Sequence, residues 1–158
     1  MKIEESIALA KRLGLPAIVV DILEKKKLPG KLWLHFGCPE EIFMTEEGNL
    51  EERLLGRQLV PLWDDGNFAR IVFYDEERSG FVSLYMEFPE EGLGKIYNWE
   101  QVMALEFKGL WESELEEEEM IHLAGLFEFE GIRRLLEVLG ADPYEDRTFD
   151  TFLKELGT

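Results

Sequence analysis

The stretch LVPLWDDGNF (59–68) and its continuation ARIVFYDEERSGFVSLYMEF (69–88) decide the fold. Three segments of this stretch are dominated by apolar residues, and many of these are aromatic or β-branched. Such residues fit the pleated surface of a sheet better than a helix. We therefore predict three strands, at 59–63, 71–74 and 81–88.

Two polar breaks separate the predicted strands, at 64–67 and at 75–80. Asp and Asn side chains bond to nearby backbone amides, and Gly accepts positive φ, so both breaks predict turns between antiparallel strands. Pro61 has no amide hydrogen to give to a neighbouring strand. The first strand is therefore expected to lie at an edge of the sheet or to be irregular at that point.

Apolar residues recur at helical spacing before this stretch. A first helix is predicted over 3–13, with Gly14 as its stop. A second helix begins at Pro16, and the lysine run 25–27 suits the negative end of its dipole. This run is the only basic cluster in the sequence, and helix-end stabilisation explains it better than phosphate binding does.

The segments between these helices and the first strand carry weaker patterns. Residues 31–37 alternate loosely between polar and apolar, which predicts a strand. Residues 42–44 are apolar and predict a short further strand. Residues 46–57 are polar with one apolar pair, and they are compatible with a loop or a short helix.

Helical spacing returns after the strands. Asn98 is a favourable N-cap for a helix over 99–110. Ser113 is expected to cap the next helix, because Glu116 follows three residues later and would complete a capping box.

The chain continues in helices to its end. A helix over 132–139 is expected to end at Gly140 and Pro143. The last helix is expected to begin at Thr148 or Asp150. Helices therefore account for the whole C-terminal part of the chain.

Helices at both ends and strands in the middle predict an α+β fold. In this fold a central antiparallel β-sheet has flanking N-terminal helices and a C-terminal helical segment. A length of 158 residues suits one domain with a sizeable core. We therefore expect one domain over 1–158, with 112–158 as a helical extension packed on it.

The sequence is strongly acidic, with 34 Asp and Glu against 17 Lys and Arg, so its formal net charge is −17. This charge repels nucleic acid phosphates and anionic membranes, and it attracts a basic protein. Acidity that only keeps a protein in solution explains the same composition. Cys38 is the only cysteine, and no apolar run approaches the ~18 residues that span a bilayer. The N-terminus lacks the pattern of a signal peptide, so we expect a cytoplasmic protein.

The sequence contains no recognisable catalytic or cofactor-binding motif. His35 and His122 are the only histidines, and neither has a zinc-like partner spacing with Cys38. Asp64 and Asp65 offer oxygens to a hard cation, but the turn lacks the ligand periodicity of a calcium loop. We therefore expect no catalytic residue, no metal and no cofactor. A small hydrolase that uses turn carboxylates with a metal is kept as an alternative.

Acidic residues cluster in the turns of the strands and before the second C-terminal helix. This clustering fits a docking surface for a basic partner, and it also fits an ordinary solvated face. Exposed aromatics among the acids, with Trp63, Phe68 and Tyr74 as candidates, would supply apolar anchors. The predicted partner-binding residues are Asp64, Asp65, Phe68, Asp75, Glu76, Glu77, Glu116, Glu117 and Glu118.

The central block resembles the SUKH superfamily, which contains bacterial immunity proteins and the yeast cell-wall-assembly regulators. The resemblance rests on 59–68, on the strand that ends in Tyr74-Asp75 with the Gly80 turn, and on the strand that ends near Glu87. Asn98-Trp99-Glu100-Gln101-Val102 and Leu15-Pro16 also resemble elements of the family. The likeness covers roughly 14–111. The family's Gly-rich turn is replaced here by 25–30, and the helices after Glu112 have no counterpart in it.

The resemblance implies an α+β fold and a protein that is not an enzyme. It also implies that the protein binds a toxin, often a nuclease, and neutralises it. An acidic inhibitor suits a nuclease, whose nucleic acid groove is basic. We therefore expect an immunity protein that neutralises a cognate toxin by direct binding. The alternative is a regulatory or scaffolding module of the same fold that binds another cellular protein.

Overall fold

The computed structural model describes residues 1–141 and 146–157, and it confirms the predicted α+β fold. These residues form eight α-helices and one three-stranded antiparallel sheet. The chain divides into two compact units, Met1–Ile96 and Tyr97–Thr158. The sheet and the N-terminal helices belong to the first unit, and the last four helices belong to the second.

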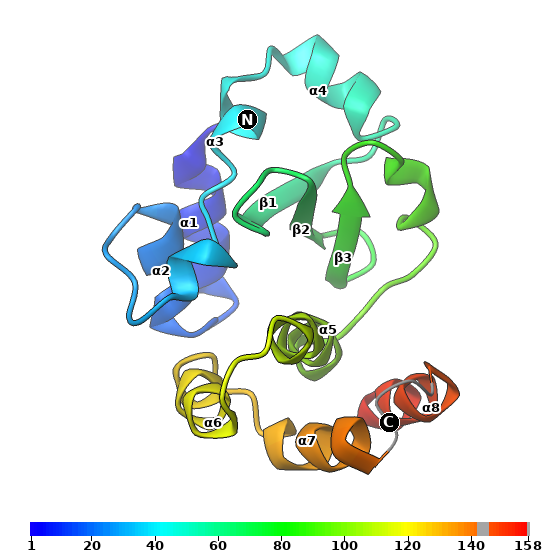
Figure 1. Cartoon of the computed structure of the whole chain (residues 1–158). Helices are drawn as coiled ribbons and strands as arrows, with labels where there is room; N and C mark the ends of the chain where they lie inside the picture. Colours follow the sequence, from blue (N-terminus) through cyan, green and yellow to red (C-terminus); the bar gives the residue numbers. More distant parts are fainter. Residues whose placement is uncertain (142–145, 158) are drawn as a thin grey trace. The chain divides into compact units, whose positions relative to one another are not determined.

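The first unit contains four of the α-helices, two short 3₁₀ helices and the whole sheet (Figure 1). Its elements, in chain order, are α1 (Ile3–Arg12), α2 (Ala17–Leu23), η1 (Leu32–Leu34), α3 (Glu40–Met44), α4 (Glu47–Arg53), β1 (Leu59–Asp64), β2 (Arg70–Asp75), β3 (Gly80–Tyr85) and η2 (Pro89–Glu91).

The three predicted strands are confirmed, and they pair in the order β1-β2-β3. The register places Phe73 of β2 opposite Val82 of β3. The register between β1 and β2 shifts between Pro61 and Trp63, and β1 is an edge strand, so both readings of Pro61 hold. The missing amide hydrogen of proline is the physical reason for the interruption.

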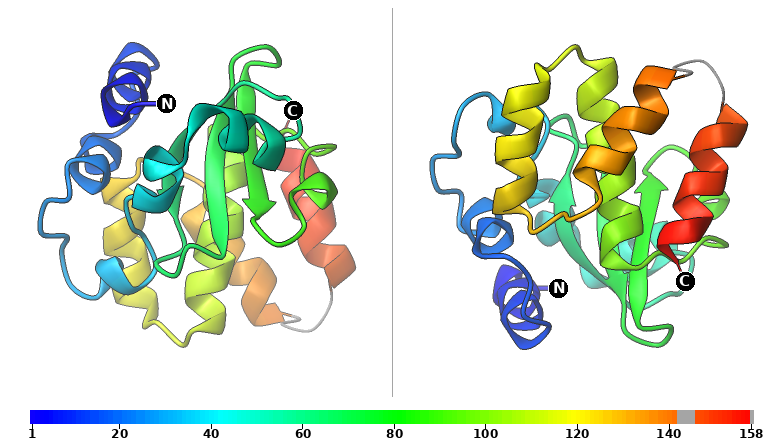
Figure 2. Two further views of the ribbon diagram at one scale, coloured as in Figure 1. Left: turned by 90° about the horizontal axis from the view of Figure 1, so that it is seen from above. Right: turned by 90° about the horizontal axis from the view of Figure 1, so that it is seen from below.

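Helices α3 and α4 cover one face of the sheet (Figure 2, left). Ile42 of α3 and Leu50 and Leu54 of α4 pack there with residues of all three strands, and these side chains are buried. Burial of such side chains stabilises the fold by about 1.5 to 3 kcal/mol each. The strand residues in this cluster are Leu59, Ile71, Phe73, Val82 and Leu84.

The two predicted N-terminal helices are also confirmed, as α1 and α2, and both contact β1 (Figure 1). Gly14 follows α1 with a φ of 68°, as expected for a glycine stop. Lys25, which follows α2, has a φ of 59°, so the chain reverses within the lysine run.

Two of the predicted strands are wrong. Within residues 31–37, Leu32–Leu34 form the 3₁₀ helix η1, and the only strand-like pairing is an isolated bridge from Gly37 to Asp64. The loose alternation in this segment was too weak to specify pairing. Residues 42–44 belong to α3. Pro39 suits the entry to a helix, and the negative charges of Glu40 and Glu41 in the first turn stabilise the positive N-terminal end of the helix dipole. Residues 46–57, which the sequence left open, contain α4.

The third strand ends at Tyr85, earlier than the predicted end at Phe88. Pro89 starts η2, since its fixed φ suits a helical turn and ends strand pairing. Gly92 then passes so close to β3 that a Cβ atom on it would lie against the Ser83 carbonyl oxygen and 2.7 Å from Leu84 Cδ2. Glycine at this position therefore allows η2 to lie against the end of the sheet.

The second unit is helical (Figure 2, right). Its helix α5 contacts each of the three helices that follow. The predicted N-cap is confirmed: the Asn98 side chain accepts a hydrogen bond from the Gln101 amide at 2.8 Å, and Gln101 completes a capping box. The four helices are α5 (Trp99–Glu112), α6 (Glu117–Leu126), α7 (Ile132–Ala141) and α8 (Asp146–Leu156).

Helix boundaries in this unit differ from those predicted. Ser113 does not cap α6; the N-cap is Glu116, which makes no side-chain capping bond. The predicted start of the last helix was wrong, because α8 begins at Asp146. The preceding helix was expected to end at Gly140 and Pro143, but α7 includes Gly140 and runs to Ala141, and Pro143 lies outside the described residues. The structure groups α5 with the later helices, whereas the sequence placed the start of the extension at 112.

Within the described residues, no helix is both long and apolar enough to cross a bilayer.

The close approach at Gly92 predicts a destabilising effect of Gly92→Ala. The added methyl group has no room beside Ser83 and Leu84, so η2 must move away from β3. Overpacking of this kind typically costs about 1 to 3 kcal/mol in the free energy of unfolding. Urea denaturation followed by circular dichroism measures this loss.

Gly94→Ala is the matched control, since no atom lies within 4 Å of a Cβ built at Gly94. Equal unfolding midpoints for the two variants would contradict the steric argument.

Candidate protein-binding surface

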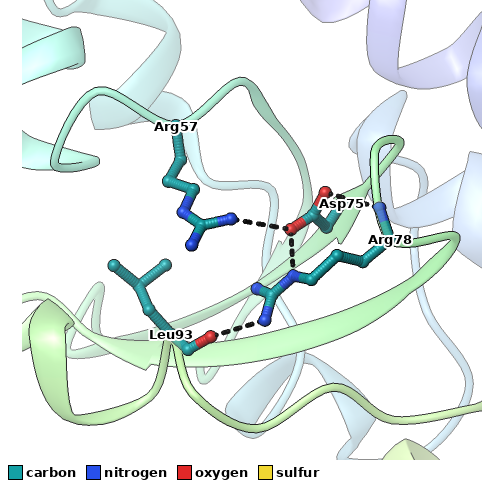
Figure 3. Close-up of polar contacts among 4 residues, drawn as sticks. All are labelled: Arg57, Asp75, Arg78 and Leu93. Carbon is teal, nitrogen blue, oxygen red and sulfur yellow. Dashed lines mark hydrogen bonds and ion pairs between the residues drawn. The ribbon is translucent and has the colours of Figure 1, made fainter.

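Asp75 lies at the end of β2 and is almost fully buried, with 1% of its surface exposed. Its carboxylate accepts hydrogen bonds from the Arg78 backbone amide at 3.1 Å and from Arg78 Nε at 2.7 Å (Figure 3). Arg57 approaches the same carboxylate, with Nη1 3.9 Å from Oδ2. Asp75 was predicted to contact a partner, but burial removes it from any contact surface and gives it a structural role.

Arg78 extends this network to the segment that follows η2. Its Nη1 donates to the Leu93 carbonyl oxygen at 2.8 Å (Figure 3). The Leu93 side chain packs against the core cluster of the sheet. Asp75 and Arg78 therefore hold the β2–β3 turn and the end of the η2 segment together.

The charge on Arg78 also determines the ionisation of Asp75. Burial by itself raises the pKa of Asp75. Hydrogen bonds from the side chain and backbone of Arg78, together with its charge, outweigh burial and lower the pKa of Asp75 below its ordinary value of 3.8. Asp75 is therefore ionised at neutral pH.

Asp64 and Asp65 build the turn between β1 and β2. Asp64 Oδ1 accepts a hydrogen bond from the Gly66 amide at 2.8 Å, and only 6% of Asp64 is exposed. Asp65 Oδ1 accepts from the amides of Asn67, at 3.1 Å, and Ala69, at 3.2 Å. Burial therefore removes Asp64 from the predicted contact surface, and Asp65 is held by its own turn.

Burial also affects the ionisation of Asp64. It raises the pKa of the carboxyl group, and the hydrogen bond from Gly66 opposes this shift. The negative charges of Asp65, Glu41 and Glu40 raise the pKa further.

Phe68, in this turn, lines a pocket of ≈ 420 Å³ at the end of β3. We call it the β3-end pocket. Tyr85 and Phe88, two of its lining residues, are 58% and 50% exposed. Phe68 is half-buried, with a φ of 59°. The complete lining is Phe68, Ala69, Tyr85, Met86, Glu87, Phe88 and Glu91.

Of the three aromatic anchors that the sequence suggested, only Phe68 lines this pocket. Trp63 is fully buried, with its ring centroid 6.1 Å from that of Phe36, so its predicted exposure was wrong. Tyr74 is half-buried and packs edge-on against Phe81 at 5.2 Å.

The acids of the β2–β3 turn are exposed, as a contact surface requires. Glu76 pairs with Arg12 at 2.6 Å. Glu77 is exposed, and no ion pair of the described residues involves it. Exposed ion pairs such as Arg12–Glu76 are weak, so both side chains can exchange partners readily.

Glu116, Glu117 and Glu118 are exposed at the start of α6, in the second unit. Glu117 and Glu118 lie in the first helical turn, where negative charge favours the helix. None of the three lines the β3-end pocket. The predicted set therefore divides into buried turn residues, exposed acids on two units, and one pocket residue, Phe68.

The predicted set missed every other residue of the pocket lining, namely Ala69, Tyr85, Met86, Glu87, Phe88 and Glu91. The sequence interpretation extended the third strand to Phe88, which treats its aromatic residues as part of the sheet. The signal was Pro89, which ends pairing and leaves the preceding aromatic residue outside the sheet.

Groups that could carry chemistry are dispersed. Among residues 1–141 and 146–157, no three His, Cys, Asp or Glu side chains converge to hold a metal ion. His35 is half-buried and His122 is exposed. Burial raises the pKa of Cys38 to about 11, against the opposing charge of Lys25, so the thiol is protonated at neutral pH.

Comparison of the chain with models of protein families, with curated proteins and with solved structures found no match. Membership of the SUKH superfamily therefore stays a prediction from the sequence.

The Asp75 network predicts a pH-dependent loss of stability in Asp75→Asn. At neutral pH the variant loses charge-assisted bonds to Arg78, which typically contribute about 1.5 to 3 kcal/mol. Because the folded pKa of Asp75 is lowered, its contribution is complete above the ordinary pKa of 3.8 and is lost as pH falls through the folded pKa. Urea denaturation at pH 7 and at several values below pH 4 measures the difference from wild type.

Glu77→Gln is the control, because Glu77 is exposed. A difference between Asp75→Asn and wild type that stayed constant down to the lowest pH would contradict the assigned role of the charge.

The buried carboxyl group of Asp64 predicts the opposite behaviour. Its raised pKa means that ionisation costs folding stability as pH rises above 3.8 towards the folded pKa. Asp64→Asn removes this cost and retains an oxygen for Gly66, so its free energy of unfolding at pH 7 should equal or exceed that of wild type. Asp64→Ala removes the acceptor and should lose about 1 kcal/mol. Thermal and urea unfolding at pH 7 compare the variants; a large loss in Asp64→Asn would contradict the assignment.

Proposed function

We propose that this chain is a non-enzymatic, acidic binding protein that acts as an immunity protein and neutralises a toxin by direct binding. The partner is a basic protein, and a nuclease fits the charge. The net charge of −17 and the dispersal of chemically reactive groups support the proposal. The sequence resemblance to the SUKH superfamily supports it independently.

The observation that carries the proposal is the β3-end pocket. It combines exposed aromatic side chains, Tyr85 and Phe88, with exposed glutamates, Glu87 and Glu91. Aromatic side chains supply most of the apolar contact energy at interfaces, while charge selects the partner and speeds association. Recognition of a basic protein therefore explains a surface with both features better than a general role in solubility does.

The glutamates of the segment 87–91 are available to a partner. No ion pair among the described residues involves Glu87, Glu90 or Glu91, so their charge is not neutralised locally. A nuclease that binds nucleic acid presents a groove of Lys and Arg. An inhibitor that covers the groove competes with the phosphate backbone through the same kind of charge interaction.

Titration of the chain against the purified product of the adjacent gene tests the proposal. We expect a stable complex whose association rate falls as salt is added, because exposed charges steer the encounter. Glu87→Gln, Glu90→Gln and Glu91→Gln combined should slow association by about tenfold. Stopped-flow fluorescence and calorimetry give the rate and the affinity.

The matched control is Glu128→Gln, Glu130→Gln and Glu137→Gln combined, which changes the same charge at exposed positions of the second unit. Absence of binding to any basic protein encoded beside this chain would overturn the proposal. Binding to a non-toxic cellular protein would instead favour a regulatory or scaffolding role.

A further inference from the structure

We propose that the β3-end pocket accepts an arginine side chain of the partner, with the guanidinium group between the exposed aromatic rings and the glutamates. This inference rests on the proposed function, and it assigns a specific contact to one surface.

The apolar part of the pocket suits the planar face of a guanidinium. Tyr85 and Phe88 are each at least half exposed, which leaves ring surface available for contact. Met86 and Phe68 also line the pocket and pack against the core of the sheet. A guanidinium stacks on aromatic faces and is less strongly hydrated than an ammonium group, so arginine suits such a site better than lysine.

The acidic part of the pocket supplies the matching charge. Glu87 and Glu91 both line it and are both exposed. Carboxylates bind guanidinium groups through paired, charge-assisted hydrogen bonds, which a single ammonium group cannot reproduce. The pocket volume of ≈ 420 Å³ lies near the lower end of the ~300–1,000 Å³ typical of ligand sites.

The backbone around the pocket is held by hydrogen bonds, which reduces the cost of binding. The Met86 amide donates to the Ala69 carbonyl oxygen at 2.9 Å, and the Glu91 amide donates to that of Phe88 at 3.2 Å. The contact between Arg78 and Leu93 secures the end of the same segment. A preformed pocket loses little conformational freedom when a side chain enters.

The chain already shows that a guanidinium fits beside one of these rings. Arg53 of α4 lies over the Phe68 ring, with its Cζ atom 5.7 Å from the ring centroid. Arg53 does not line the pocket, and with one positive charge it leaves an excess of negative charge there. The proposed contact of the partner's arginine is therefore of the same kind as the contact between Arg53 and Phe68 within the chain.

Short peptide probes test the assignment without the toxin. We would titrate a blocked tetra-arginine peptide and a blocked tetra-lysine peptide into the ¹⁵N-labelled full chain and follow the amide resonances by NMR. The expected result is that the arginine peptide binds at least fivefold more tightly and shifts the amides of Phe68, Met86, Glu87, Phe88 and Glu91 most. Equal binding of the two peptides, or shifts centred elsewhere, would overturn the assignment.

Variants separate the pocket from general attraction between opposite charges. Phe88→Ala and Glu91→Gln should each weaken arginine-peptide binding at least fivefold, and both positions are exposed, so circular dichroism should show an unchanged fold. Glu77→Gln, which removes the same charge outside the pocket, should have little effect. Equal weakening by Glu77→Gln and Glu91→Gln would overturn the assignment.

The same variants distinguish this inference from the proposed function. Toxin binding that Phe88→Ala leaves unchanged would overturn the arginine contact while the immunity function stands. Arginine-selective binding at the pocket without binding to any neighbouring toxin would support the pocket and overturn the immunity function.

Discussion

The buried carboxylate of Asp75 is the constraint on which the first unit depends. A charge with 1% exposure is stable in a protein only when it is paired and hydrogen-bonded. Arg78 meets this requirement from the adjacent turn, and it also reaches the Leu93 carbonyl oxygen. One side chain thereby satisfies the buried charge and fixes the segment that carries η2. The position of the exposed aromatic residues beside η2 thus follows from a buried electrostatic requirement.

Acidic residues have two physical roles in this chain. Asp64, Asp65 and Asp75 accept hydrogen bonds within turns, so most of their binding capacity is used by the backbone. Glu87 and Glu91 remain at the surface beside aromatic residues. The difference matches side-chain length: a short aspartate reaches its own backbone, whereas a glutamate extends into solvent. A count of acids along the sequence does not separate these roles.

Strong local signals made much of the fold predictable. Asn98 with Gln101 marked the start of α5, and the polar breaks at 64–67 and 75–80 marked the turns between strands. The segment 31–37 was not predictable because its geometry depends on tertiary contacts, including the bridge from Gly37 to Asp64. The candidate surface was only partly predictable, since the burial of Trp63 depends on tertiary packing against Phe36, and the exposure of Phe88 depends on where β3 ends.

The interruption of β1 at Pro61 has a consequence for the behaviour of the protein at high concentration. An edge strand with a regular row of free amide and carbonyl groups recruits strands from other molecules and can seed fibrils. The proline and the register shift beside it break that row, and α1 and α2 contact the same strand. Aggregation by lateral growth of the sheet is therefore disfavoured on this side.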